Sequence, residues 1–200
     1  MTREYIIEKS TAMFLQHGFK TVTMDNVAEE LSVSKKTLYE IFGNKDSLIE
    51  DVMRHNLQTA MSKLSEISTQ AHNAVEEMYY MQHYFNHHFD LNQRSICIYQ
   101  LKRYYPKIYK QIFETSKKDF IQFIAQNLQR GKTQKLYREP VYTELYSAWF
   151  FESKTYFVDQ LEKESKFSSE EISFTLFDTF MRGICTPEGL DCYLKLNTPS

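Results

Sequence analysis

Two adjacent lysines, Lys35 and Lys36, begin a short amphipathic stretch and are the residues of this chain best suited to binding chemistry. Ser34 before them can cap a helix, and Thr37 follows them. Ammonium and hydroxyl groups at a helix N-terminus suit phosphate, which the helix dipole also favours, and the base edges of DNA. We therefore expect residues 34–37 to contact DNA, although a lysine pair on a helix is usually only a solvated surface.

The stretch after Ser34 has the pattern of the second helix of a helix-turn-helix. Apolar residues recur at helical spacing up to Phe42, and Gly43 suits a left-handed end, so a helix of about nine residues is predicted. A second short helix is predicted upstream, capped by Thr23 and carrying three apolar residues on one face: Val27, Ala28 and Leu31. Such a pair can lay its first helix over the phosphates and present the second to the major groove.

The residues around this helix pair resemble the N-terminal domain of the tetracycline-repressor (TetR) family of bacterial transcription regulators. The resemblance covers roughly the first fifty residues and rests on apolar and polar positions in register: Ile6, Phe14, Gly18, Phe19, Thr23, Val27, Ala28, Val33, Ser34, Thr37, Leu38, Tyr39, Phe42, Lys45 and Leu48. It implies a DNA-binding regulator, in which we expect Thr23, Tyr39 and Lys45 to hold the DNA backbone.

Three positions depart from the family pattern, namely Ser10, Ser32 and Lys36. Ser32 stands where the turn usually has glycine, and a serine there would be strained at positive φ. These changes leave the fold prediction intact. They mean, however, that the operator sequence of a relative cannot be assumed to be the operator of this protein.

Composition and charge set the outer limits. With 200 residues, 42% of them hydrophobic, the chain suits one DNA-reading domain, residues 1–48, and one larger domain, residues 49–200. The net charge is −2, and residues 1–50 hold six Lys and Arg against eight Asp and Glu. DNA affinity must therefore come from local placement, with few phosphate contacts per subunit.

Helical periodicity continues almost to the end of the chain, and no stretch alternates convincingly as a strand. The expected helices span about 45–67, 73–89, 93–104, a segment from Pro106 to a loop at 131–133, 141–162 and 169–185. The predicted class is all-α, with a three-helix helix-turn-helix domain followed by a larger helical ligand-binding and dimerisation domain.

A ligand pocket is predicted in the larger domain. One face of the helix near 73–89 carries apolar walls with polar groups between them: Met78, Gln82, Phe85, Asn86 and Phe89. Tyr99 and Phe113 are further candidates, and the resemblance also implies a small-molecule effector. The alternative is an aromatic core whose amides find backbone partners or water.

Other chemistry is less well supported by the sequence. His83 and His87 stand one helical turn apart, but no companion ligand is recognisable, so a solvated pair is favoured over a metal site. Three cysteines, Cys97, Cys185 and Cys192, are expected to be reduced thiols. We expect no metal, no cofactor and no enzymatic activity, and the absence of a signal-peptide or membrane-length apolar run predicts a cytoplasmic protein.

The resemblance further implies a homodimer through a four-helix bundle made by the last two long helices of both subunits. The apolar contact is expected from six residues: Trp149, Phe150, Phe151, Leu176, Phe177 and Phe180. The favoured function is a repressor that a small molecule releases from a palindromic operator. A small-molecule-binding module that no longer reads DNA and, more remotely, a helical enzyme remain alternatives.

Overall fold

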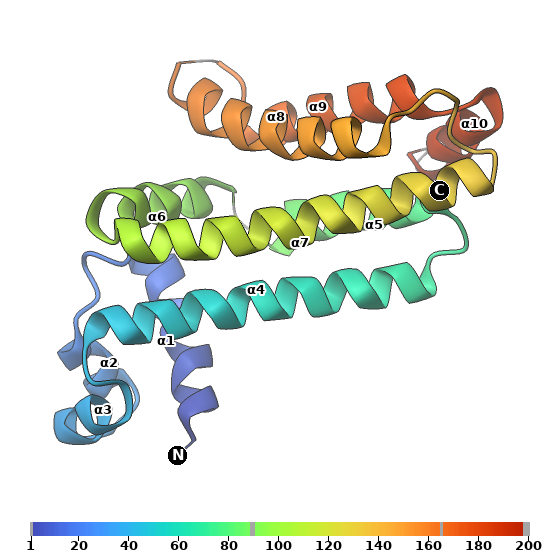
Figure 1. The fold of residues 1–200 in the computed structure, drawn as a ribbon. Helices are drawn as coiled ribbons and strands as arrows, with labels where there is room; N and C mark the ends of the chain where they lie inside the picture. Colours follow the sequence, from blue (N-terminus) through green and yellow to red (C-terminus); the bar gives the residue numbers. More distant parts are fainter. Residues whose placement is uncertain (1, 89–90, 165, 198–200) are drawn as a thin grey trace. The chain divides into compact units, whose positions relative to one another are not determined.

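The computed structural model describes residues 2–88, 91–164 and 166–197. Within these ranges the chain forms ten helices and no β-strand, which confirms the all-α class (Figure 1). The helices are α1 (Arg3–His17), α2 (Met24–Glu30), α3 (Lys35–Phe42), α4 (Lys45–Gln70), α5 (Ala74–His88), α6 (Leu91–Tyr104), α7 (Pro106–Thr133), α8 (Thr143–Glu164), α9 (Ser169–Ile184) and α10 (Pro187–Leu196). None of these described helices has the length and hydropathy needed to cross a bilayer.

One prediction was wrong, and one helix was not predicted. The loop expected at residues 131–133 is the last turn of α7, because Gly131 serves a close approach rather than a break: a Cβ there would lie 2.0 Å from the Tyr137 ring. Helix α10 was not predicted, although Thr186 caps it and Pro187 occupies its first turn.

The chain forms two compact units that do not follow one another in sequence. Residues 1–62 group with residues 92–116, and residues 63–91 group with residues 117–200. We name them the N-terminal unit and the C-terminal unit. The expected division into a domain of residues 1–48 and a domain of residues 49–200 stays a prediction.

In the described part of the N-terminal unit, α6 and the start of α7 contribute to the apolar core. Leu38 and Leu48, from the helix-turn-helix region, share this core with Leu101 of α6 and Ile108 of α7. Packing of this kind fixes the end of α6 and the start of α7 to the helices that carry Lys35 and Lys36.

The C-terminal unit pairs α8 with α9 and packs α10 against α5 and α9. Figure 1 shows α8 and α9 lying side by side. Their shared interior is aromatic: the ring centroids of Phe150 and Phe180 lie 4.4 Å apart, and Tyr193 of α10 meets Phe177 at 6.0 Å. Much of the aromatic excess of the sequence therefore forms the core of this unit.

Candidate nucleic-acid interface

Helix α2 is fixed at its start by a reciprocal capping box. The Thr23 hydroxyl accepts a hydrogen bond from the Asn26 amide at 3.1 Å, and the Asn26 side chain accepts one from the Thr23 amide at 2.9 Å. This satisfies backbone donors that the first turn would otherwise leave open. The inner face of α2 is buried through Val27 and Ala28, so the outer face is held at a fixed rotation.

The turn between α2 and α3 depends on Ser32, which adopts φ 53°. The Val33 amide donates to the Ala28 carbonyl at 2.9 Å and closes the turn. The left-handed conformation expected from the family pattern is therefore present, but at a serine, where it is less favourable than at glycine.

Helix α3 begins at its cap and presents a polar outer face. The Ser34 hydroxyl accepts from the Thr37 amide at 3.0 Å, while Leu38 and Phe42 are buried. Because these two apolar side chains anchor one face, Lys36 and Tyr39 are exposed to solvent. Gly43 ends the helix at φ 74°.

The two adjacent lysines have different environments. The Lys35 ammonium lies 2.6 Å from an oxygen of Asp25, and the hydrogen bond and charge of that carboxylate raise the pKa of Lys35. The Lys36 side chain is 85% exposed, and its nearest acidic partner, Glu40, is 3.7 Å away. Lys35 is thus tied to α2, whereas Lys36 can extend toward a base edge.

Lys45 stands at the start of α4 beside the loop that follows α1. Its Nζ lies 3.5 Å from the Lys20 carbonyl oxygen, and partial burial lowers the pKa of Lys45 despite an opposing effect of Asp46. The Lys20 amide in turn donates to the Gln100 side chain of α6 at 2.8 Å. Sequence reasoning missed Gln100, because 80 residues separate it from Lys20 and no local pattern links them.

The seven expected DNA-binding residues all lie on a short, continuous part of the N-terminal unit, from the cap of α2 to the first residue of α4: Thr23, Ser34, Lys35, Lys36, Thr37, Tyr39 and Lys45. The hydroxyls of Thr23 and Ser34 are engaged in capping, so any phosphate contact they make is in addition to that role. Contact with DNA stays a prediction for each residue.

The expected ligand residues are divided between the two units. Met78, Gln82, Phe85 and Asn86 belong to the C-terminal unit, Tyr99 and Phe113 belong to the N-terminal unit, and Phe89 lies outside the described residues. Tyr99 is exposed, and the Phe113 ring stacks on Tyr109 with centroids 5.4 Å apart.

Within the C-terminal unit, the polar members of this set bond to other side chains. The Gln82 amide donates to Asn86 at 2.9 Å and to the Ser173 hydroxyl at 3.0 Å, and its carbonyl accepts from Lys154. Met78 is fully buried, and the Phe85 ring meets Phe120 at 5.7 Å. This geometry agrees with the alternative of an aromatic core with satisfied amides, and ligand binding stays a prediction.

A different hollow lies between the end of α4 and α5. It is an open cleft of about 410 Å³ that shares no residue with the expected ligand set, and it is lined by Lys63, Ile67, Gln70, His72, Tyr80, His83 and Tyr84. His83 also stacks on Tyr79 at 5.2 Å, and the side chain of its expected partner His87 lies outside the described residues.

Three of the expected dimer-contact residues require correction. Phe150, Phe177 and Phe180 are each 1% exposed and pack inside the protomer, so they cannot be the surface that meets a partner. Phe151 and Leu176 are partly buried, and Trp149 is exposed.

Large apolar side chains that sequence reasoning missed are exposed on the same two helices: Leu145 and Tyr156 on α8, and Phe174 on α9. Tyr142, just before α8, is also exposed. The sequence signal for this set is its spacing. Leu145, Trp149 and Tyr156 lie three, seven and fourteen residues after Tyr142, which places all four on one helical face.

Comparison with known proteins extends these observations. Residues 6–52 match the model of the family described as bacterial regulatory proteins, tetR family. An uncharacterised HTH-type transcriptional regulator of Bacillus subtilis, YhgD, is 36% identical over 64 residues, which are 32% of this chain and 34% of that protein. The HTH-type transcriptional repressor KstR2 of Mycolicibacterium smegmatis is 24% identical over 38% of this chain and 37% of its own length. The matches therefore span less than half the length of these curated relatives.

The fold similarity covers more of the chain. A crystal structure of a putative transcriptional regulator from Saccharomonospora viridis in complex with choline has a TM-score of 0.74 at 17% identity, over 92% of this chain and 97% of that one. At that identity the likeness concerns the fold, an N-terminal helix-turn-helix followed by a helical domain. Residues 6–52 thus match the model of the tetR family of bacterial regulatory proteins, and the helical architecture of the chain is similar to that of solved transcriptional regulators.

Proposed function

We propose that the protein is a cytoplasmic DNA-binding transcription regulator, a repressor that a small molecule releases from its operator. The observation that carries the proposal is the outer face of α3, where Lys36 extends into solvent from a helix held by a cap and by two buried side chains. A rigid helix with exposed cationic and hydroxyl side chains at its N-terminus suits a major groove. Repression is inferred from the KstR2 relative, which is named a repressor.

A homodimer is part of this proposal. One recognition helix reads only a few base pairs, so two-fold pairing and a palindromic operator are needed for useful specificity. The exposed apolar side chains of α8 and α9, which include Leu145, Trp149 and Phe174, support pairing through these two helices. Such side chains are costly to leave in water and suit a second copy of the same helices.

The effector is proposed to bind in the C-terminal unit. Support comes from the hydrogen-bonded group of Gln82, Asn86 and Ser173, of which Gln82 and Ser173 are buried, and from the choline bound by the Saccharomonospora viridis regulator. An effector would have to replace the hydrogen bonds that these side chains now make with one another. No enzymatic activity is proposed.

Selection of duplexes from a random-sequence pool tests DNA binding directly. The wild-type protein should enrich a related set of sequences. Lys36→Ala should lose about 1 to 3 kcal/mol of base discrimination, whereas Lys45→Ala should weaken all duplexes alike, because it meets only phosphate. Lys118→Ala, an exposed lysine of the C-terminal unit, is the matched control and should behave as wild type.

Failure of the wild-type protein to retain any duplex at low salt would overturn the proposal and favour a helical module that does not read DNA. Unchanged selectivity in Lys36→Ala together with unchanged affinity in Lys45→Ala would remove residues 34–45 as the DNA-reading surface.

A further inference from the structure

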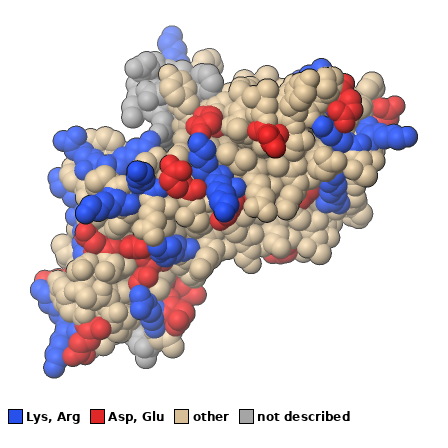
Figure 2. Space-filling view, in the orientation of Figure 1, with Lys and Arg blue, Asp and Glu red and all other residues tan. Residues whose placement is uncertain are grey.

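A second basic surface lies where α6 ends and α7 begins, and the helix-turn-helix assignment does not use it. It consists of four cationic residues, Lys102, Arg103, Lys107 and Lys110, which we name the basic corner. All four are exposed, and no Asp or Glu occurs in the sequence from residue 91 to residue 113. Figure 2 shows the Lys and Arg side chains gathered at this junction of α6 and α7.

The basic corner is fixed to the DNA-reading helices. Leu101 and Ile108, which flank it, are buried in the apolar core of the N-terminal unit. The Cys97 thiol of α6 donates to the Phe14 carbonyl of α1 at 3.5 Å. Because the core is shared, the basic corner and α3 belong to one compact unit.

Close contacts also connect the basic corner to Lys45. The Lys45 ammonium lies 3.5 Å from the Lys20 carbonyl, and the Lys20 ammonium lies 3.4 Å from the Tyr104 hydroxyl and over its ring. The Arg103 guanidinium lies 5.9 Å from the centroid of the same ring. Cationic side chains therefore continue from the start of α4 through Lys20 to the basic corner.

The charge of the unit depends on this segment. Residues 1–62 hold seven Lys and Arg against nine Asp and Glu, whereas residues 92–116 hold five against one. The segment thus changes the net charge of the unit from −2 to +2. A polyanion would meet a net acidic unit without it and a net basic unit with it.

One lysine of the basic corner occupies a position that helix stability does not favour. Lys107 lies in the first turn of α7, where the helix dipole favours acidic residues. Helices α3, α6 and α7 have no acidic residue in the first turn, whereas each of the other described helices has at least one. Lys107 and Lys110 have no carboxylate partner among the described residues. A lysine in a position that the helix dipole disfavours, with no carboxylate partner in the described part of the chain, indicates that an anion outside the chain is its partner.

We propose that the basic corner is a second phosphate-binding surface that holds the DNA backbone outside the groove read by α3. The inference rests on the proposed function, since the DNA is the ligand of both surfaces. Exposed Tyr99 and Tyr104 beside the cations suit the same partner, because tyrosine hydroxyls donate to phosphate oxygens. The basic corner adds affinity without sequence information, and it compensates for the acidic balance of residues 1–62.

The test compares two double variants that remove the same charge. Lys107→Gln with Lys110→Gln alters the basic corner, and Lys118→Gln with Lys166→Gln removes two exposed lysines of the C-terminal unit. Affinity for a pool of random-sequence duplexes is measured at several salt concentrations. The basic-corner variant should bind more weakly. The slope of log affinity against log salt is negative, and its magnitude should decrease by about one for each lysine lost per subunit. The control should keep the wild-type slope.

The outcomes separate this inference from the proposed function. If the wild-type protein binds no duplex, both are wrong. If it binds and selects sequences but the basic-corner variant keeps the wild-type slope, only the inference is wrong. An equal decrease in the magnitude of the slope in both double variants would also overturn it, because net charge rather than position would then be responsible. Thermal unfolding of the basic-corner variant should match wild type, since Gln in the first turns of α7 breaks no contact.

Discussion

Two residues that flank α3 adopt positive φ, and only one of them is glycine. Ser32 has φ 53° in the turn before the helix, and Gly43 has φ 74° at its end. No atom beyond the adjacent residues lies within 4 Å of a Cβ built on Gly43, so backbone conformation alone would decide the effect of a side chain there.

These positions give a matched pair of substitutions with opposite expected signs. Ser32→Gly should raise the free energy of unfolding by up to about 1 kcal/mol, because glycine accepts the left-handed conformation without steric cost but loses more chain entropy on folding. Gly43→Ala should lower it by about 1 to 2 kcal/mol. Urea unfolding measures both. A loss of stability in Ser32→Gly would mean that the serine hydroxyl contributes more than its backbone strain costs.

Local chemistry explains why the helix-turn-helix could be predicted from the sequence. The signals of this motif are local: they are the caps Thr23 and Ser34, the apolar residues between them, and Gly43. Each acts over at most four residues, so it can be recognised in the sequence without knowledge of the fold. The Gln100 contact and the basic corner could not be read in this way. They depend on the return of residues 92–116 to the N-terminal unit, which only tertiary packing determines.

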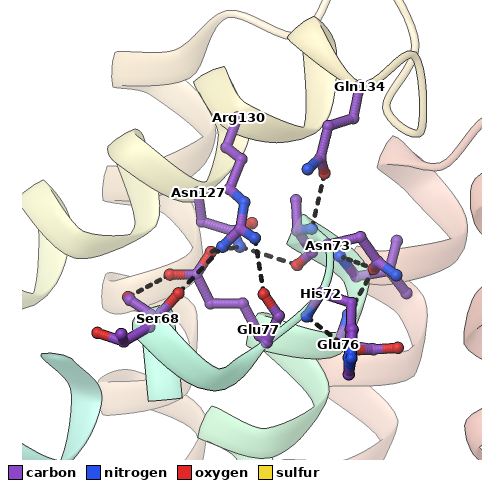
Figure 3. Close-up of polar contacts among 12 residues, drawn as sticks. Ser68, His72, Asn73, Glu76, Glu77, Asn127, Arg130 and Gln134 are labelled. Atoms are coloured by element: carbon purple, nitrogen blue, oxygen red, sulfur yellow. Dashed lines mark hydrogen bonds and ion pairs between the residues drawn. The ribbon is translucent and has the colours of Figure 1, made fainter. Parts of the chain in front are cut away.

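At the scale of elements, one buried polar network joins the end of α4, the start of α5 and the end of α7 (Figure 3). The Arg130 guanidinium donates to the carbonyls of Ser68 and Ala71, at 3.3 and 2.7 Å, and lies 3.2 Å from the Glu77 carboxylate. The same carboxylate accepts from Asn127 at 2.8 Å and from the Ser68 hydroxyl. Arg130 thus occupies carbonyls that the C-terminal end of α4 would otherwise leave open.

Removal of the Arg130 guanidinium alone should destabilise the protein. Arg130→Met should lower the free energy of unfolding by about 2 to 3 kcal/mol, because it leaves the buried Glu77 carboxylate without its cation. Adding Glu77→Gln to that variant should recover part of the loss, since the uncompensated charge is then gone. Chemical denaturation of the single and double variants measures the coupling. Equal stability of the two would mean that the Arg130 contacts to the α4 carbonyls, rather than the ion pair, carry the effect.

Helix boundaries show where sequence patterns stop being informative. The starts of α7 at Pro106 and of α9 at Ser169 agree with the predicted starts, because Pro106 and the capping residue Ser168 each act on the first turn of their helix. Gly131 was interpreted as the end of a helix, because glycine can either interrupt a helix or leave room for a close neighbour. The neighbour here is the Tyr137 ring, whose position is apparent only in the folded chain. The same limit explains Phe150, Phe177 and Phe180: periodicity places them on helices but cannot tell a core face from a dimer face.

The whole molecule is expected to be a dimer through the exposed face of α8 and α9. Leu145→Glu should give a monomer that remains folded, because the residue is 63% exposed in the protomer and the charge would disfavour only the contact with a partner. Tyr80→Glu, an exposed residue of α5, is the control and should leave the assembly unchanged. Sedimentation of the intact chain should show twice 23.9 kDa for wild type and control. A monomeric wild-type protein that still binds a palindromic duplex tightly would contradict this expectation.

Release of DNA by an effector requires that the two units be coupled, and α4 and α7 each have more than one turn in both units. Residues 45–62 of α4 lie in the N-terminal unit and residues 63–70 in the C-terminal unit, and α7 passes from one to the other after residue 116. An effector that binds best when α4 is shifted would select dimers whose two α3 helices are wrongly spaced for successive major grooves.

Such coupling is reciprocal, which makes it measurable as a closed cycle. Coupling of about 1 to 3 kcal/mol is typical, so the effector should weaken operator binding between about 5-fold and 150-fold, and the operator should weaken effector binding by the same factor. Titration of each ligand with and without the other supplies all four affinities. Arg130→Met should reduce this factor, because it loosens the end of α4 from α7 while leaving α3 and the basic corner unaltered. A molecule that binds the C-terminal unit stoichiometrically but leaves operator affinity unchanged would not be the effector. If every such molecule behaved in this way, α4 would act only as a spacer, and release would need a different explanation.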